Sequence, residues 1–126
     1  MLKNGPRYPR QRRIKMNEGE IYWAKFSEEE RLGHEIKKDR PCVIIRNFVG
    51  KGLVFVVPLS TSNNRADDEY VVVIAPSKEN GLEDFSVAIT YQALSLAKDR
   101  LIRKSGNLDK ETLILIKENL KKCLGL

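Results

Sequence analysis

The segment PCVIIRNFVGKGLVFVVPL, residues 41–59, contains two apolar runs separated by a short turn rich in glycine. Both runs are dominated by β-branched and aromatic side chains, which fit the pleated surface of a β-strand. The residues between the runs, 49–52 (VGKG), are of the kind that ends one strand before the next begins. The segment therefore predicts one strand at residues 41–47 and another at residues 53–59.

Similar runs lie on both sides of this segment. Residues 20–26, 69–75 and 85–90 have the same composition, and residues 99–104 are a candidate sixth strand. Polar stretches with glycine or proline separate the runs. Short strands at regular spacing without helices between them are typical of a small barrel or sandwich. The fold class is therefore predicted to be mainly β.

The period of the sequence changes after residue 108. Asp109 is a candidate N-cap, Glu111 favours the positive end of a helix dipole, and Gly125 is a candidate end. Apolar residues recur at the spacing of one helix face: Leu113, Ile116, Leu120 and Cys123 or Leu124. The opposite face carries Lys117, Glu118, Lys121 and Lys122. This pattern predicts a C-terminal helix that packs on the strands.

A chain of 126 residues has the size of one domain and can bury a core without disulfides or metal. Cys42 and Cys123 lie far apart in the sequence and form no Cys-x-x-Cys pair, so both are predicted to be reduced core thiols. No apolar run approaches the roughly 18 residues of a membrane span, and no signal-peptide core follows the basic N-terminus. We therefore expect a cytoplasmic protein that has no membrane partner.

The net charge of +6 comes from the N-terminal segment, because 17 basic residues and 17 acidic residues balance in the rest of the chain. Residues 1–16 are predicted to be a flexible basic extension, and residues 17–126 the folded domain. The extension is either an arm that attracts the phosphates of a nucleic acid or a solvated segment without a role. The basic residues before the first acid, Glu18, are Lys3, Arg7, Arg10, Arg12, Arg13 and Lys15.

Several kinds of site are missing from the sequence. A single histidine excludes a His-x-x-x-His metal pair, and the cysteine spacing offers no zinc site. No phosphate-binding loop of the G-x-x-x-x-G-K-[ST] kind and no G-x-G-x-x-G motif after a strand is present. We therefore expect neither a metal nor a cofactor. Polar residues remain at the predicted strand ends, in residues 33–35 (GHE), at Arg40 and in residues 60–62 (STS).

The order of these segments resembles a known family. GEIYWAKF (19–26), GHE (33–35), RPCVIIRN (40–47) and VVPLSTS (56–62) follow one another as in the first half of MazF/PemK/Kid toxins. Residues 91–126 are similar to the second half, in which a D-Q motif and an R-L pair precede a helix that ends in Leu-Gly-Leu. The resemblance covers residues 18–126.

This resemblance implies both a fold and a function. The fold is a small SH3-like β-barrel of the CcdB/MazF kind with a C-terminal α-helix. The activity is that of a toxin of a type II toxin–antitoxin system, a metal-independent endoribonuclease (mRNA interferase) that cuts single-stranded RNA by attack of the 2′-OH. The implied partners are mRNA, a cognate antitoxin whose C-terminal segment occupies the RNA groove, and a second copy of the chain in a homodimer.

The resemblance also assigns roles to particular residues. Arg40 and Thr61 match catalytic residues of the family. A guanidinium stays charged and matches phosphate oxygens with a fork of donors, and a hydroxyl can bond the scissile phosphate. His34 could also act as a base, because histidine titrates near neutral pH. The residues assigned to substrate binding are His34, Glu35, Ser60, Ser62 and Gln92.

Each of these residues also has a purely structural interpretation. Arg40 could pair with Asp39 or with an acidic residue of the 28–30 run, and Thr61 could bond its own backbone in a turn. His34 could be a solvated loop residue. Trp23 and Phe55 are predicted to be core residues rather than platforms for stacked bases.

The sequence departs from the family pattern near the expected site. Tyr91 stands where an aspartate is common, and Ile89 where some members have a catalytic arginine. Residues 36–39 (IKKD) replace the usual glutamine and glycine residues before Arg-Pro. Two other functions therefore stay open: a member of the same fold that only binds RNA or an antitoxin, and a toxin directed at DNA or gyrase.

Overall fold

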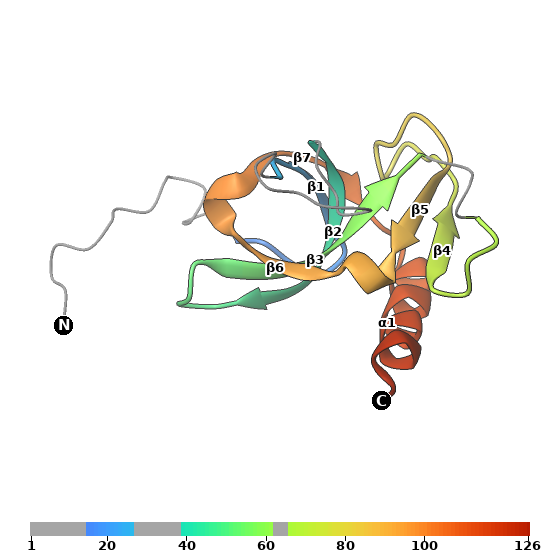
Figure 1. Ribbon diagram of the computed structural model, residues 1–126. Coiled ribbons are helices and arrows are strands. Elements are labelled where there is room, and N and C mark those ends of the chain that lie inside the picture. The colour runs from blue at the N-terminus through green and yellow to red at the C-terminus, as the bar shows by residue number, and fades with distance from the viewer. Residues whose placement is uncertain (1–14, 27–38, 62–65) are drawn as a thin grey trace, which may run out of the picture.

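The computed structural model describes residues 15–26, 39–61 and 66–126. Antiparallel strands make up most of this part of the chain, and one helix follows them (Figure 1). In chain order the elements are β1 (Glu20–Ala24), β2 (Arg40–Phe48), β3 (Leu53–Ser60), β4 (Val71–Ile74), β5 (Ser86–Ile89), the 3-10 turn η3 (Thr90–Gln92), β6 (Leu94–Ala97), the 3-10 turn η4 (Lys98–Arg100), β7 (Leu101–Asn107) and α1 (Lys110–Leu124).

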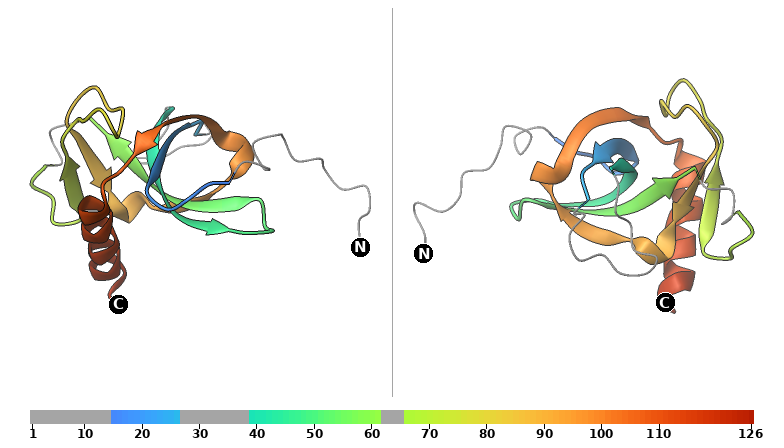
Figure 2. Two further views of the ribbon diagram at one scale, coloured as in Figure 1. Left: turned by 180° about the vertical axis from the view of Figure 1, so that it is seen from behind. Right: turned by 45° about the horizontal axis from the view of Figure 1, so that its top comes forward.

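The seven strands form one sheet in the order β4-β5-β3-β2-β1-β7, and β6 pairs with β3 beside this path. Figures 1 and 2 show β1, β2, β3, β6 and β7 curled around one side of the molecule, with β4, β5 and α1 on the other. Among the described residues, β6 and β7 are not paired, so hydrogen bonds do not close the ring. The predicted mainly β fold with a C-terminal helix is confirmed, with an open sheet in place of a closed barrel.

The central strands are buried on both faces, which explains their continuous apolar sequences. In β2, Cys42 and Ile44 pack into one core cluster with Tyr22, while Val43 and Ile45 pack into a second. The first cluster fills the inside of the curled strands. The second is covered by α1 through Ile116 and Leu120, so the helix packs on the outer face of the sheet, as its sequence pattern predicted.

Strand β3 changes its partner along its length. Residues 53–56 pair with β6, whereas Leu59 and Ser60 pair with β5. Pro58 has no backbone N–H and falls in the interval between these two partners. A proline is therefore tolerated in a central strand at this point.

The predicted helix ends are confirmed. The Asp109 carboxylate accepts a 3.0 Å hydrogen bond from the Thr112 N–H, which gives a first-turn donor the partner that the helix cannot supply. Gly125 ends the helix at a φ of +74°, where a residue without Cβ is unstrained, and its N–H caps the carbonyls of Lys121 and Lys122. Leu124, one of the two alternatives for the apolar face, is exposed.

The structure corrects three sequence predictions. Strand β6 was missed because its sequence, LSLA, lacks β-branched and aromatic residues. The candidate strand at residues 99–104 starts only at Leu101, since residues 98–100 form η4. Cys42 is a buried free thiol, and burial raises its pKa to about 12, but Cys123 is only half-buried and is not a core residue.

Met16 packs inside the first core cluster, and its carbonyl accepts a hydrogen bond from the Asn47 side chain.

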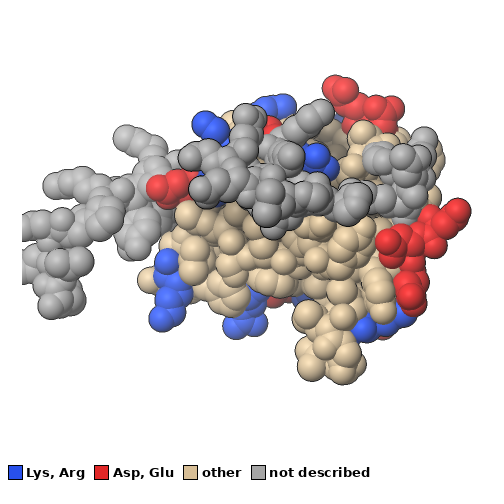
Figure 3. Space-filling model, in the orientation of Figure 1, with Lys and Arg blue, Asp and Glu red and all other residues tan. Residues whose placement is uncertain are grey.

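In the view of Figure 3, acidic side chains gather on the side that carries β4 and β5, whereas Lys and Arg lie on both sides. Of the described residues, none belongs to a helix of the length and hydropathy that crossing a membrane requires.

Candidate active site

The predicted catalytic residues lie at one end of the sheet, where β1 ends, β2 begins and β3 ends. Arg40 opens β2 opposite Ala24, the last residue of β1. Ser60 ends β3, and Thr61 follows it. Because β2 and β3 run antiparallel, the start of one meets the end of the other.

A pocket of about 370 Å³ opens at this end of the sheet, and we call it the Arg40 pocket. It brings together three of the residues that the sequence assigned to the site: Arg40, Ser60 and Thr61. Its lining is completed by Trp23, Asp39, Pro41, Leu59 and Ser86. A guanidinium beside two hydroxyl groups can hold a phosphate group and stabilise additional negative charge on it.

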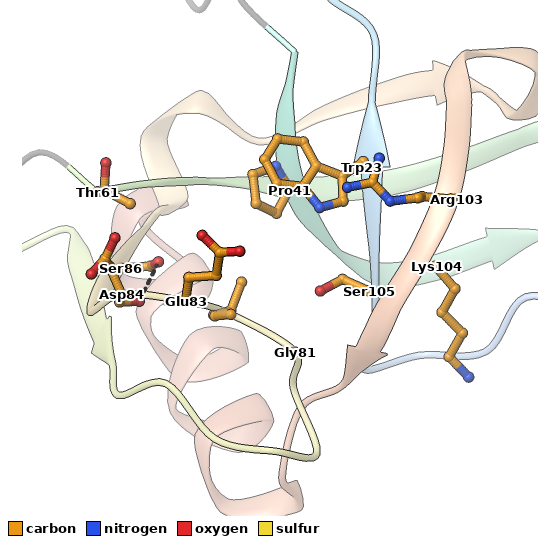
Figure 4. Close-up of a pocket in the computed structure, with 11 residues that line it drawn as sticks. Trp23, Pro41, Thr61, Gly81, Glu83, Asp84, Ser86, Arg103, Lys104 and Ser105 are labelled. Atoms are coloured by element: carbon orange, nitrogen blue, oxygen red, sulfur yellow. Dashed lines mark hydrogen bonds between the residues drawn. The ribbon is translucent and has the colours of Figure 1, made fainter.

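A second pocket of about 350 Å³ adjoins the first, and we call it the Glu83 pocket (Figure 4). Trp23, Pro41, Thr61 and Ser86 line both pockets, so the two form neighbouring parts of one depression. The remaining residues of the Glu83 pocket come from the segment before β5 and from β7: Gly81, Leu82, Glu83, Asp84, Arg103, Lys104 and Ser105.

The two basic residues of the Glu83 pocket, Arg103 and Lys104, have different partners. The Arg103 guanidinium lies 5.2 Å from the centre of the Trp23 ring, within the range of a cation–π contact. Figure 4 shows the Lys104 side chain turned away from the pocket, and its ammonium is 3.2 Å from a carboxylate oxygen of Glu20. Among the described residues that line this pocket, the cationic group that remains is therefore Arg103, opposite Glu83 and Asp84.

Glu20 forms an ion pair with Lys104, one of the residues that line the Glu83 pocket. Its burial acts to raise the pKa of the carboxyl, but the hydrogen bond from the Asn17 N–H and the neighbouring Lys104 outweigh burial, so the pKa lies below its ordinary value. The carboxylate therefore stays charged and keeps Lys104 paired.

The segment in front of β5 forms a firmly held wall. Buried Asn80 accepts hydrogen bonds from the N–H groups of Ser77 and Leu82 and donates one to the Ala75 carbonyl. Gly81 has a φ of +70°, and a Cβ on it would lie 2.2 Å from the Ser105 carbonyl oxygen. This close approach fixes the segment against β7, so Glu83 projects from a rigid base.

The other predicted residues fall into two groups. His34, Glu35 and Ser62 lie outside the described residues. Gln92 lies in η3 and lines neither of the two pockets described above, so the structure does not bring it together with Arg40.

Sequence reasoning missed several pocket residues. Trp23 was assigned to the core, yet its side chain is only half-buried and lines both pockets. The alternation of β1 carried a signal, because Tyr22 and Ala24 face the first core cluster and leave Trp23 on the other face. Nothing local marked Glu83 or Arg103, since each meets Trp23 only through the tertiary fold. Phe55 does pack against the second core cluster, as predicted.

The two departures from the family pattern have different surroundings. Ile89 is fully buried in the first core cluster, so its side chain contributes to packing. Tyr91 is 43% exposed at the surface in η3. Within the described part of the chain, no group of three or more His, Cys, Asp or Glu side chains is placed to hold a metal ion.

Comparison with known proteins agrees with this fold. MazF from Deinococcus radiodurans is 20% identical over 88% of this chain and 97% of that chain, with a TM-score of 0.71. The Mycobacterium tuberculosis toxin MazF-mt6 is 21% identical over 85% of this chain and 97% of its own, with a TM-score of 0.66. A mycobacterial endoribonuclease in complex with its cognate antitoxin is 23% identical, covers 89% and 97% of the two chains and has a TM-score of 0.66.

No match is found among curated proteins. One family model, described as PemK-like, MazF-like toxin of type II toxin-antitoxin system, matches residues 17–124. Since this match spans most of the chain, the protein belongs to the family of PemK-like, MazF-like toxins of type II toxin–antitoxin systems.

Proposed function

We propose that this protein is a sequence-specific endoribonuclease that cuts single-stranded RNA in the cytoplasm without a metal ion and is inhibited by a cognate antitoxin. The observation that carries the proposal is the Arg40 pocket, in which Arg40, Ser60 and Thr61 meet at one end of the sheet. The pocket lies inside the segment that matches the toxin family.

The chemistry has three requirements. The 2′-OH of the preceding ribose attacks the phosphorus, so a base must accept its proton. The pentacoordinate phosphorane carries additional negative charge, and the leaving 5′ oxygen needs a proton. The products are a 2′,3′-cyclic phosphate and a 5′-OH, which balance without water in this step.

Arg40 suits the charge-stabilising role, because its guanidinium remains charged and can donate two parallel hydrogen bonds to phosphate oxygens. Thr61 is exposed and lines the pocket, so its hydroxyl can donate to the same phosphate, with Ser60 beside it. His34 and Glu35 are proposed to bind the substrate or accept the 2′-OH proton. Ser62 and Gln92 are proposed to contact the RNA.

The proposed partners follow from the family. One similar structure is an endoribonuclease with its cognate antitoxin. We propose that this protein also has a cognate antitoxin, which inhibits it by covering the Arg40 pocket. We also propose a homodimer as the active form, and residues 1–15, which precede the buried Met16, as a basic extension that attracts RNA phosphates without sequence preference.

The test is incubation of the purified protein with a long unstructured RNA in EDTA, followed by mapping of both fragment ends. We expect cuts at a short motif, with 2′,3′-cyclic phosphate and 5′-OH ends. An Arg40→Ala variant should lose them, while Lys51→Ala removes a positive charge from the distant turn between β2 and β3 and should retain them.

A second candidate is a member of the family that binds RNA or antitoxin without cleavage. Buried Ile89 and exposed Tyr91, in place of the arginine and aspartate seen in other members, favour it. RNA binding without product at any RNA concentration would support this candidate and contradict the ribonuclease.

A further inference from the structure

Apart from the residues that it shares with the Arg40 pocket, the Glu83 pocket has a lining of its own, which the proposed phosphate chemistry does not use. Four residues are common to both pockets, so the Glu83 pocket is within reach of a base next to a phosphate bound at Arg40 and Thr61. A volume of about 350 Å³ is at the small end of the range for ligand pockets, about 300–1,000 Å³, and suits one base.

One wall of the Glu83 pocket is suited to a flat aromatic ring. Trp23 is half-buried and lines the pocket, so part of its indole surface is open to it. The Arg103 guanidinium lies 5.2 Å from the Trp23 ring centre. Figure 4 shows Trp23, Arg103 and Pro41 together on this wall. Proteins hold unstacked RNA bases on aromatic rings and on guanidinium planes of this kind.

The opposite wall carries hydrogen-bond acceptors. Figure 4 shows the Glu83 carboxylate directed into the space below Pro41 and Trp23. Among the described residues, neither Glu83 nor Asp84 forms an ion pair, and Lys104 is held by Glu20. Ionised carboxylates accept hydrogen bonds and donate none, so this wall attracts N–H groups and repels phosphates.

The four RNA bases differ in what they present to such a wall. Guanine offers two adjacent donors on its Watson–Crick edge, N1–H and N2–H, which match the two oxygens of one carboxylate. Adenine and cytosine offer one amino group each. Uracil has one N–H between two carbonyl oxygens, which a carboxylate repels.

We propose that the Glu83 pocket is a base subsite that favours guanine and disfavours uracil at one position of the RNA motif, with Glu83 as the specificity-determining residue. The proposal rests on the proposed ribonuclease function. The rigid segment that carries Glu83, held by buried Asn80 and by the contact of Gly81 with Ser105, supports it, because a fixed acceptor discriminates better than a mobile one.

The experiment measures cleavage in EDTA of RNA oligonucleotides that carry each base in turn at each motif position. The parent should prefer guanine over uracil about 10-fold at one position, within the range for a bidentate base contact. Glu83→Gln replaces one acceptor oxygen with an amide donor, so it should reduce the preference at that position to about 2-fold or less and leave the other positions unchanged. The matched control is Glu79→Gln, the same change at an exposed residue outside both pockets, and it should behave as the parent.

The outcomes separate this proposal from the proposed function. If Glu83→Gln cleaves the parental motif with every base preference unchanged, the base subsite is wrong and the ribonuclease stands. If the parent does not cleave RNA, the base preference is measured instead from the binding of a random 2′-O-methyl heptanucleotide library. Enrichment of guanine at one position, lost in Glu83→Gln, would then support the subsite on its own, and its absence would overturn it. Because Glu83 is exposed, the three proteins should have equal unfolding midpoints. Equal midpoints exclude a folding defect as the cause of a changed base preference.

Discussion

The two ends of the central sheet hold their polar side chains in different ways. At the pocket end, Thr61 and Glu83 are exposed and line the Glu83 pocket. At the helix end, Thr90 is 1% exposed, and its hydroxyl lies within hydrogen-bond distance of the Tyr70 carbonyl and the Asn119 side chain. Asn119 in turn donates to the Glu69 carbonyl.

The difference indicates a division of roles. Buried polar groups with all partners inside the protein stabilise the packing of α1 on the sheet, whereas exposed groups at the strand ends are available for substrate. Substitutions at the pocket end should therefore change cleavage and leave stability intact. Substitutions at the helix end should do the reverse.

The largest effect is expected at Arg40. Arg40→Ala should lower the cleavage rate constant about 1,000-fold or more, which corresponds to about 4 kcal/mol of transition-state stabilisation. Arg40→Lys should recover only part of the rate, because an ammonium lacks the planar donor fork. Single-turnover cleavage gives the rates, and urea unfolding should show a change below about 1 kcal/mol. A loss of stability large enough to explain the lost activity would contradict the division of roles.

The same chemical change at both ends gives the sharpest comparison. Thr90→Val removes a buried hydroxyl and leaves the Asn119 acceptor without this donor, so the free energy of unfolding should fall by about 2 kcal/mol. Thr61→Val should change unfolding by less than about 0.5 kcal/mol, because Thr61 is exposed, and should lower the cleavage rate. Urea unfolding and cleavage at 20 °C measure both quantities. The reverse pattern would break the comparison.

A smaller effect is expected at the start of α1. Asp109→Ala removes the N-cap carboxylate that accepts from the Thr112 N–H and should lower the free energy of unfolding by about 1 kcal/mol. Asp99→Ala, an exposed acid in η4, serves as the control. Equal stability of the two variants would show that the cap contributes nothing.

The smallest effect is expected at Glu20, and it depends on pH. The pKa of Glu20 in the folded state lies below the ordinary 4.5, so its carboxylate stabilises the fold above about pH 4.5, and this contribution is lost as the pH falls through the lowered pKa. Glu20→Gln should therefore cost about 0.5 kcal/mol at pH 7, since Lys104 is partly exposed. Urea unfolding between pH 3 and pH 7 should show the two proteins converging at low pH. A constant difference would contradict the ion pair as its cause.

Much of the fold was predictable because local signals agree with it. The β-branched runs marked five strands, and Asp109 and Gly125 marked the ends of α1. Strand β6 was not predictable, since Leu94–Ala97 takes its extended form from pairing with β3 rather than from its composition.

The site was predictable only in part. Arg40 and Thr61 could be named because they lie in two successive blocks of an ordered family pattern, residues 40–47 and 56–62, and at the ends of neighbouring strands. The Glu83 pocket could not, because β1, the segment before β5 and β7 meet there from distant parts of the chain. Register shifts between β1 and β7 decide which β7 side chains face Trp23, and no local pattern encodes such shifts.

The most direct test of the cleavage mechanism compares two oligonucleotides that contain the mapped motif, one all-ribose and one with a single 2′-deoxyribose before the scissile phosphate. In EDTA, the parent protein should cut the first at the motif and leave the second intact, because the attacking 2′-OH is missing. Cleavage of both at the same phosphate, or of neither, would contradict 2′-OH attack in the Arg40 pocket.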